Sequence, residues 1–262
     1  MPKGHSPASA RYAIYFVPEP KTSLALLGSD LLGRDSETGS PISHANLADF
    51  SQQRLHDLTV DARRYGLHAT LKAPFFLKKG KTEYDLLLST KRFVRGRQAI
   101  TLPRLELARI GSFFALVPPG ESPEELETVR RINALAADAV EFFDHLRAAP
   151  SEPELARREP QKLTERQRVL LAEWGYPYVF DEYRFHITLT DKLYDSEEAR
   201  RMEECLRVYF ASVCNEETAV SSICVCRQII PGPAGVSDIH PGSNSSAFMS
   251  IMRSCFQSSQ KK

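Results

Sequence analysis

Two four-residue stretches, His68-Ala-Thr-Leu71 and His186-Ile-Thr-Leu189, repeat the pattern His-x-Thr-Leu in the two halves of a 262-residue chain. Each stretch lies in a run of residues that is typical of a β-strand. Successive side chains of a strand point to opposite faces, so the histidine and the threonine share one face and the leucine turns to the other. The sequence therefore predicts two strands that each present an imidazole beside a hydroxyl, with the reverse face anchored in the core.

The paired motifs predict a phosphoester site with His68 and His186 as catalytic residues. In-line cleavage of a phosphodiester needs a base on one side of phosphorus and an acid on the other, and an imidazole with a pKa of about 6.5 can take either role. Thr70 and Thr188 are short donors suited to the non-bridging phosphate oxygens. We expect general acid–base hydrolysis without metal or cofactor, and the sequence leaves open which histidine is the acid.

Four further residues are candidates for binding substrate phosphate. Lys72 falls by alternation on the face of the first motif, although an exposed edge lysine is equally consistent with the pattern. Arg63 and Arg64 precede the strand, and one of them could reach a second phosphate through its planar fork, or both could be solvated loop residues. Tyr178 could bond substrate or pack in an aromatic cluster.

The rest of the chain alternates between predicted strands and capped helices. Strands are expected at 11–17, through the first motif to Leu77, at 98–110, 113–117, 178–189 and 219–230. Helix starts are marked by Thr82, by Ser122-Pro-Glu-Glu125, by Thr164-x-x-Gln167 and by Asp195-x-x-Glu198. The pattern between Leu24 and Phe50 is weak, and 33–43 is expected to be a loop.

This order of elements predicts an α+β fold with antiparallel sheets. We expect a bilobal molecule of two pseudo-symmetric halves, each with an antiparallel sheet, flanking helices and one motif, around a central cleft. The predicted organisation is a flexible N-terminus at 1–10, a two-lobed phosphoesterase domain at 11–230, and a Ser/Gly/Pro-rich, poorly ordered tail without a strand at 231–262.

Composition limits the classes of partner. The 34 basic and 33 acidic residues give a net charge of +1, so no global field attracts nucleic acid or an anionic membrane. No apolar run is long enough to span a bilayer, and Ala13–Val17 is too short for a signal-peptide core. The five cysteines are odd in number and crowd toward the C-terminal end, and Cys224-x-Cys226 is expected to place two buried thiols on one strand face. We expect a cytoplasmic protein with a small-molecule partner and no membrane partner; the oligomeric state stays open.

At these residues the chain resembles the two-histidine (ligase-like) phosphoesterase superfamily. It is most similar to a bacterial branch usually encoded with phosphonate-utilisation (carbon–phosphorus lyase) genes. The segments that carry the resemblance are Arg11-Tyr-Ala-Ile-Tyr-Phe16, Arg63-Arg-Tyr-Gly-Leu-His-Ala-Thr-Leu-Lys-Ala-Pro-Phe75, Glu154-Leu-Ala-Arg-Arg158, Trp174-Gly-Tyr-Pro-Tyr-Val179 and Phe185-His-Ile-Thr-Leu-Thr190.

The resemblance implies a phosphoric diester hydrolase that acts on a small phosphoribosyl cyclic phosphate. One alternative is an RNA 2′,3′-cyclic phosphodiesterase, against which the neutral charge weighs, and another is a non-catalytic phosphate- or nucleotide-binding module. Members of this branch close with a short apolar strand soon after the segment matching Ser222–Ile230, and in this chain the Ser-rich tail takes its place.

Overall fold

One large antiparallel sheet organises the protein. The structure, a computed structural model, describes residues 9–150, 163–230 and 249–256. Seven strands form the sheet in the order β4-β5-β6-β2-β1-β8-β9, and each neighbouring pair is antiparallel. They are β1 (Ser9–Phe16), β2 (Ala69–Phe76), β4 (Glu106–Ile110), β5 (Phe113–Val117), β6 (Ile187–Thr188), β8 (Ser222–Ile230) and β9 (Met249–Cys255). A separate small sheet pairs β3 (Ile100–Leu102) with β7 (Thr218–Val220).

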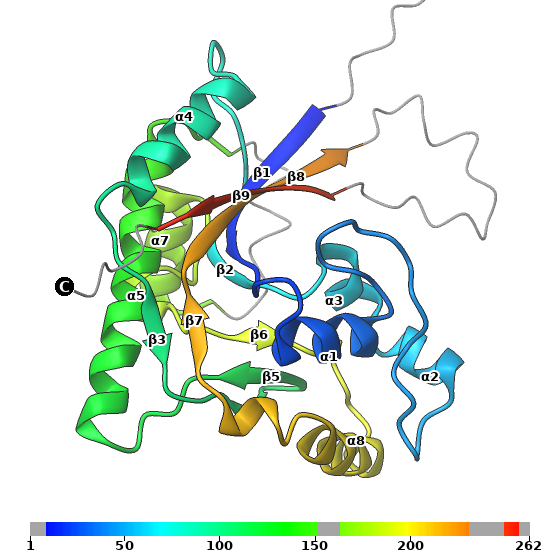
Figure 1. The fold of residues 1–262 in the computed structure, drawn as a ribbon. Helices are drawn as coiled ribbons and strands as arrows, with labels where there is room; N and C mark the ends of the chain where they lie inside the picture. The colour runs from blue at the N-terminus through cyan, green and yellow to red at the C-terminus, as the bar shows by residue number, and fades with distance from the viewer. Residues whose placement is uncertain (1–8, 151–162, 231–248, 257–262) are drawn as a thin grey trace, which may run out of the picture.

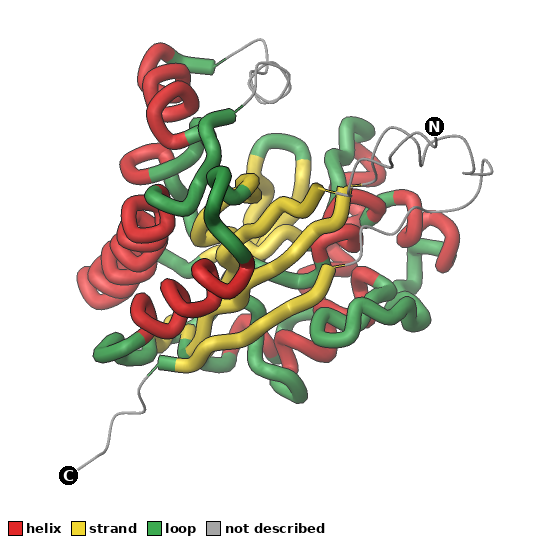
Figure 2. The backbone as a smooth tube through the Cα atoms, turned by 90° about the horizontal axis from the view of Figure 1, so that it is seen from above, coloured by secondary structure: helices red, strands yellow, loops and turns green. Residues whose placement is uncertain are grey.

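Helices lie on both sides of this sheet (Figure 2). In Figure 1, α4, α5 and α7 gather on one side, and α1, α2, α3 and α8 lie toward the other. Their bounds are α1 (Ser23–Leu32), α2 (Gln52–Asp57), α3 (Val60–Tyr65), α4 (Glu83–Val94), α5 (Pro123–Asp144), α7 (Glu165–Trp174) and α8 (Ser196–Tyr209), with 3-10 turns η1 (Phe180–Glu182) and η2 (Val213–Asn215). None of the described helices is both long and apolar enough to cross a membrane.

The predicted helix starts are confirmed by their caps. Thr82, Ser122 and Thr164 each accept a hydrogen bond from the backbone amide three residues on, and the side chain at that third position accepts one from the backbone amide of the cap residue. The Asp195 side chain accepts from the Glu198 amide at 2.7 Å and starts α8. These contacts lie within one turn, which is why local sequence predicts them.

Between Leu24 and Phe50 the sequence prediction missed a helix. Helix α1 begins at the cap Thr22, whose side chain accepts from the Ala25 amide, and ends at Gly33. Gly33 has φ 63, the left-handed conformation that glycine tolerates and that commonly ends helices. The cap and the terminal glycine were therefore present in the sequence as signals, and the short helices α2 and α3 were missed as well.

The alternation predicted for the two motif strands is confirmed. Ala69, Leu71, Ile187 and Leu189 are all buried in the main hydrophobic core. The long helix α5 packs on β2 and adds its own apolar face to this core. The reverse face of each motif is therefore held by the interior, and the histidine and threonine side chains are left on the opposite face.

The structure does not confirm a bilobal, pseudo-symmetric molecule. The strand pair β2 and β6, which carries the two motifs, is joined directly through Ala69 and Ile187. Strands from both halves of the sequence therefore belong to one sheet. The expectation of a separate sheet for each half fails because residue pattern gives strand positions but not strand partners.

The predicted tail also contains a strand, so the expectation of a strandless segment at 231–262 is wrong. Strand β9 pairs with β8 from Ser222 opposite Cys255 to Gln228 opposite Met249. It forms one edge of the sheet. Met252 is partly buried against the core and Phe256 is buried in it. This strand occupies the edge that the resemblance assigned to a short closing strand. Residues 231–248 and 257–262, with 1–8 and the segment 154–158, lie outside the described residues.

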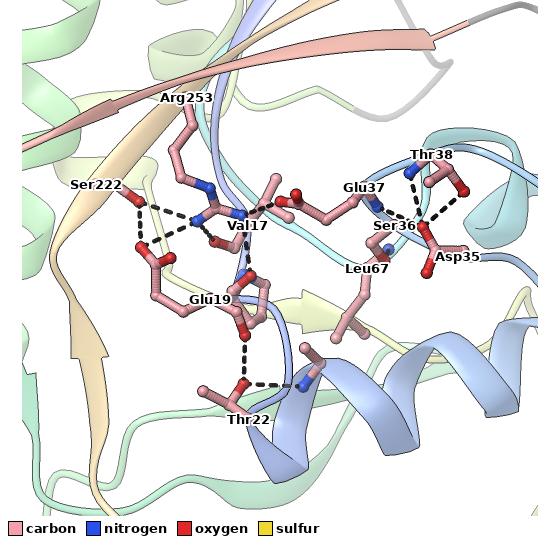
Figure 3. A network of polar contacts seen from close by, with 12 residues as sticks. Val17, Glu19, Thr22, Asp35, Ser36, Glu37, Thr38, Leu67, Ser222 and Arg253 are labelled. Atoms are coloured by element: carbon pink, nitrogen blue, oxygen red, sulfur yellow. Dashed lines mark hydrogen bonds and ion pairs between the residues drawn. The ribbon is translucent and has the colours of Figure 1, made fainter.

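Arg253 fastens β9 to the rest of the fold (Figure 3). Its guanidinium donates to the carbonyl oxygens of Val17 and Pro18 at 2.9 and 3.1 Å and to Ser222 Oγ at 3.0 Å. It also pairs with the carboxylates of Glu37 at 2.6 Å and Glu19 at 3.1 Å. One partly buried side chain thus connects the last described strand to the turn after β1 and to the loop after α1.

We expect Arg253→Ala to lower the free energy of unfolding by about 2 kcal/mol, because hydrogen bonds to a charged group are lost and partly buried acceptors lose their donor. Urea unfolding measures the change. The matched control is Arg207→Ala, which removes an exposed helical ion pair with Glu203 and should cost less than about 0.5 kcal/mol. Equal effects of the two variants would contradict this role of Arg253.

Candidate functional site

The two motifs meet on neighbouring strands of one sheet. Ala69 of β2 pairs with Ile187 of β6 in antiparallel register. Continued by one residue in each direction, this register places His68 opposite Thr188 and Thr70 opposite His186. Directly opposed side chains on one face lie about 5 Å apart and diagonal ones about 7–8 Å. The four polar side chains therefore form one compact group, as the sequence predicted, but within a single sheet face.

Both imidazoles are oriented by the same local hydrogen bond. Nδ1 of His68 bonds the carbonyl oxygen of Gly66 at 2.8 Å, and Nδ1 of His186 bonds that of Arg184 at 2.8 Å. A carbonyl oxygen only accepts, so Nδ1 carries the proton in each ring. In the neutral tautomer Nε2 is then an unprotonated acceptor. Tyr15 stacks on the His68 ring with centroids 4.0 Å apart, and Phe113 lies 5.9 Å from the His186 ring.

Burial favours the neutral form of both rings. Desolvation lowers the pKa of His68 to about 4, with a further small contribution from the nearby His186, while the Gly66 carbonyl acts in the opposite direction. Burial also lowers the pKa of His186, opposed by the Arg184 carbonyl. The effect of His186 on His68 agrees with their diagonal placement across the strand pair.

A pocket of about 690 Å³ opens beside this group. Its volume lies within the range of roughly 300–1,000 Å³ that small-molecule sites occupy. Thr70, His186 and Tyr178 are the predicted site residues that line it, whereas His68 and Thr188 are not among its lining residues. The walls come from β2, from the turn between β4 and β5, from helix α7, from the segment around η1 and from the loop after β6. They include Ser112, Phe113, Gln167, Tyr183, Arg184 and Lys192.

Tyr183 fixes the segment that carries the second motif. Its hydroxyl donates to the Thr70 carbonyl oxygen at 2.8 Å. Burial raises the pKa of this phenol, so the hydroxyl keeps its proton and remains a donor. Residues 183–186 are therefore tied to β2 by a side-chain bond as well as by the strand pairing.

Lys72 does not lie where alternation predicted it. The register between β1 and β2 shifts between the pairs Ile14–Lys72 and Tyr15–Thr70, so one extra residue of β2 lies between them. Lys72 is 4% exposed, and its Nζ donates to the Val140 carbonyl oxygen at 2.9 Å and pairs with Asp144 at 3.4 Å. Burial lowers the pKa of Lys72 to about 8, opposed by Asp144. The bulge turns this side chain to helix α5 and away from the pocket.

Arg63 and Arg64 do not line the pocket either. Arg63 is held by His56, through both the carbonyl oxygen at 3.1 Å and Nε2 at 3.1 Å, and by Thr59 Oγ1 at 3.2 Å. Arg64 forms an exposed ion pair with Asp61 at 3.7 Å. The predicted contact of either arginine with a phosphate at the motifs has no support in this arrangement.

Arg184 and Lys192 are pocket residues that sequence reasoning missed. Both are exposed, and both lie close to His186 in the chain. Arg184 precedes His186 by two residues, so a strand-like alternation from the motif outward would have suggested it. Lys192 follows the motif beyond the end of β6, and no local pattern relates it to the site.

Within the described residues, no group of three or more His, Cys, Asp or Glu side chains is arranged to hold a metal ion. The polar side chains that line the pocket are instead the His186 imidazole, hydroxyls, the Gln167 amide, the Glu182 carboxylate and the cations Arg184 and Lys192, and the His68 imidazole lies on the same sheet face. Such a set offers hydrogen-bond donors and positive charge to an anion, with Nε2 atoms that can accept or carry a proton.

Two relatives align with most of this chain. A ribose 1,5-bisphosphate phosphokinase PhnN of Janthinobacterium sp. (strain Marseille) is 38% identical over 230 residues, which are 87% of this chain and 49% of that protein. One of the same name from Laribacter hongkongensis (strain HLHK9) is 37% identical over 187 residues, 70% of this chain and 40% of that protein. The chain spans half or less of the length of these relatives.

These names correct the functional prediction. A phosphokinase transfers a phosphoryl group, so the relatives contradict the assignment of a cyclic phosphodiesterase and phosphoric diester hydrolase. The PhnN name does fit the predicted association with phosphonate utilisation, whereas membership of the two-histidine superfamily stays a prediction.

A family match covers the residues that line the pocket and part of the large sheet. It runs over residues 70–234, which include Thr70, the whole second motif and both missed cations. Because this range is well over half of the sequence, the chain belongs to the family described as a protein of unknown function (DUF1045).

Proposed function

We propose that this chain provides a binding site for a phosphorylated ribose that serves a phosphoryl-transfer system. The ligand lies in the pocket beside Thr70 and His186. Its first phosphate approaches the four-residue group formed by His68, Thr70, His186 and Thr188. The chemistry is recognition of a sugar phosphate, the substrate class in the names of both relatives.

One observation carries the proposal: the two imidazoles and two hydroxyls share one sheet face at the edge of a pocket of ligand size. Each Nδ1 is occupied by a carbonyl, which directs ring orientation and leaves Nε2 for a ligand. Threonine hydroxyls are donors to phosphate oxygens, and an imidazole becomes a second donor when a phosphate supplies its proton or stabilises its charge.

The relatives that carry the kinase name are about twice as long as this chain. The sequence of this chain indicates which part of phosphoryl transfer it serves. A P-loop for nucleotide phosphates has the pattern Gly-x-x-x-x-Gly-Lys-Ser/Thr. The nearest run here is Gly80-Lys81-Thr82, and Phe75 stands where the first glycine would be. Thr82 caps α4. Recognition of the phosphorylated sugar is therefore the role that we assign to this chain.

The names of the relatives favour a second candidate, in which this chain itself transfers the phosphoryl group. Incubation with ribose 1,5-bisphosphate, a nucleoside triphosphate and Mg²⁺ separates the two. Formation of nucleoside diphosphate that depends on the sugar phosphate supports transfer by this chain, and binding without turnover supports recognition alone.

We expect ribose 5-phosphate to bind, and His186→Gln and Thr70→Val each to weaken its affinity about tenfold or more, because a hydrogen bond to a charged group is worth roughly 1.5–3 kcal/mol. Titration calorimetry measures the dissociation constants. His145→Gln is the matched control: this exposed ring makes the same Nδ1–carbonyl bond, to Phe142 at 2.8 Å, outside the pocket. Absence of ribose 5-phosphate binding, or equal effects of His186→Gln and His145→Gln, would refute the site.

Binding should also take up protons. Burial holds the pKa of His68 low, at about 4, in the free protein, and a phosphate dianion beside the ring favours its charged form and raises that pKa in the complex. Affinity should therefore increase as the pH falls from about 8 to 6.5, where the ligand is still largely dianionic. Calorimetry in buffers of different ionisation enthalpy counts the protons. Proton release in this window would contradict a phosphate beside the imidazoles.

A further inference from the structure

We propose that Arg184 and Lys192 hold a second phosphate, so that the pocket selects a ribose with two phosphates over one with a single phosphate. This inference rests on the proposed function and extends it to the specificity of the same pocket. The first phosphate lies at the His-x-Thr group, and the second at the wall formed by these two cations.

Arg184 and Lys192 are the arginine and lysine side chains among the residues that line the pocket. Arg184 lies two residues before His186 and presents a guanidinium, whose planar fork matches phosphate oxygens. Lys192 reaches the same pocket from the loop that follows β6 and adds a compact point charge. Two cations of different geometry thus border one cavity that is also lined by Thr70 and His186 of the proposed first phosphate site.

Glu182 and Asp191, the acidic residues nearest to these cations in the chain, accept hydrogen bonds from other groups. Glu182 lines the pocket and accepts from Gln167 Nε2 at 2.9 Å. The Asp191 carboxylate accepts from the backbone amides of Asp61 and Ala62 at 3.0 Å, at the start of α3. In the described part of the chain, neither Arg184 nor Lys192 is within ion-pair distance of a carboxylate, whereas other arginines are. Their charge is therefore available to an anion, although Glu182 reduces the local positive potential.

The backbone that carries these side chains is fixed. The Arg184 carbonyl oxygen bonds His186 Nδ1 at 2.8 Å, and the adjacent Tyr183 hydroxyl is bonded to β2. On either side of Lys192, the Asp191 amide donates to the Leu58 carbonyl at 2.7 Å and the Leu193 amide to the Ser112 carbonyl at 2.6 Å. These two bonds fix the backbone at Lys192, from which its side chain reaches the pocket.

The cavity has room for such a ligand. A volume of about 690 Å³ exceeds the need of one phosphate bound at the His-x-Thr group. The lining also includes Phe113 and Tyr178, whose rings suit the carbon skeleton of a sugar. A ribose that carries two phosphates matches a lining that combines hydroxyl and imidazole groups, aromatic rings and two cations.

The test compares the dissociation constants of ribose 1,5-bisphosphate and ribose 5-phosphate in wild type and in Arg184→Gln/Lys192→Gln. We expect the wild type to prefer the bisphosphate at least tenfold, and the double variant to lose this preference with less than a threefold change for ribose 5-phosphate. The preference should also fall as salt is raised, because both cations are exposed to solvent.

The matched control is Lys79→Gln/Arg95→Gln, which removes the same charge at exposed positions outside the pocket. It should retain the preference. A wild type that binds both ligands equally, a double variant that keeps the preference, or one that loses both affinities alike would overturn the second phosphate site. Failure of ribose 5-phosphate to bind, or binding unaffected by His186→Gln, would instead refute the proposed function.

Discussion

The backbone pairing of Ala69 with Ile187 is the contact on which the rest of this site depends. It joins two strands that lie far apart in the sequence and fixes which of their residues lie opposite one another. A shift by one residue would turn one histidine and one threonine into the core and bring Ala or Ile to the surface. The burial of Ala69, Leu71, Ile187 and Leu189 opposes such a shift, because each would lose its place in the interior. The core thus fixes the geometry of the polar face.

Two features act on the imidazoles in opposite directions. The carbonyl bonds at Nδ1 favour a charged ring, and burial favours a neutral one. Burial is the larger effect at both histidines, so two adjacent rings avoid the repulsion of two like charges in the free protein. A phosphate ligand changes this balance because its charge compensates the cost of protonation. In the free protein the neutral imidazoles therefore add no fixed positive charge to the site. An anionic ligand favours their charged form once it is bound.

The comparison with longer relatives changes how the paired motifs are interpreted. Two histidines beside two hydroxyls are compatible with hydrolysis, and that chemistry was the natural prediction from the motifs. The relatives carry the name of a phosphokinase, and this chain spans half or less of each. A group that binds phosphate serves recognition as well as cleavage, because hydrogen bonding to non-bridging oxygens is common to both. The proposed phosphate-binding role of the motifs is therefore compatible with more than one reaction.

The sequence by itself determined the features that depend on contacts within a few residues. Helix starts at Thr82, Ser122 and Thr164 follow from side chains that bond amides one turn away. The two-residue period of a strand places His68 and Thr70 on one face. It likewise places Cys224 and Cys226 on one face, and both thiols are buried.

Only the tertiary structure decided what depends on pairing between distant segments. It joined the expected lobes into one sheet, and it placed β9 on β8, where Arg253 secures it. A bulge directed Lys72 to α5, and the loop after β6 brought Lys192 to the pocket. The reason is physical: alternation and capping are properties of one segment, whereas register, bulges and loop positions are set by the partner strand, which local sequence does not specify.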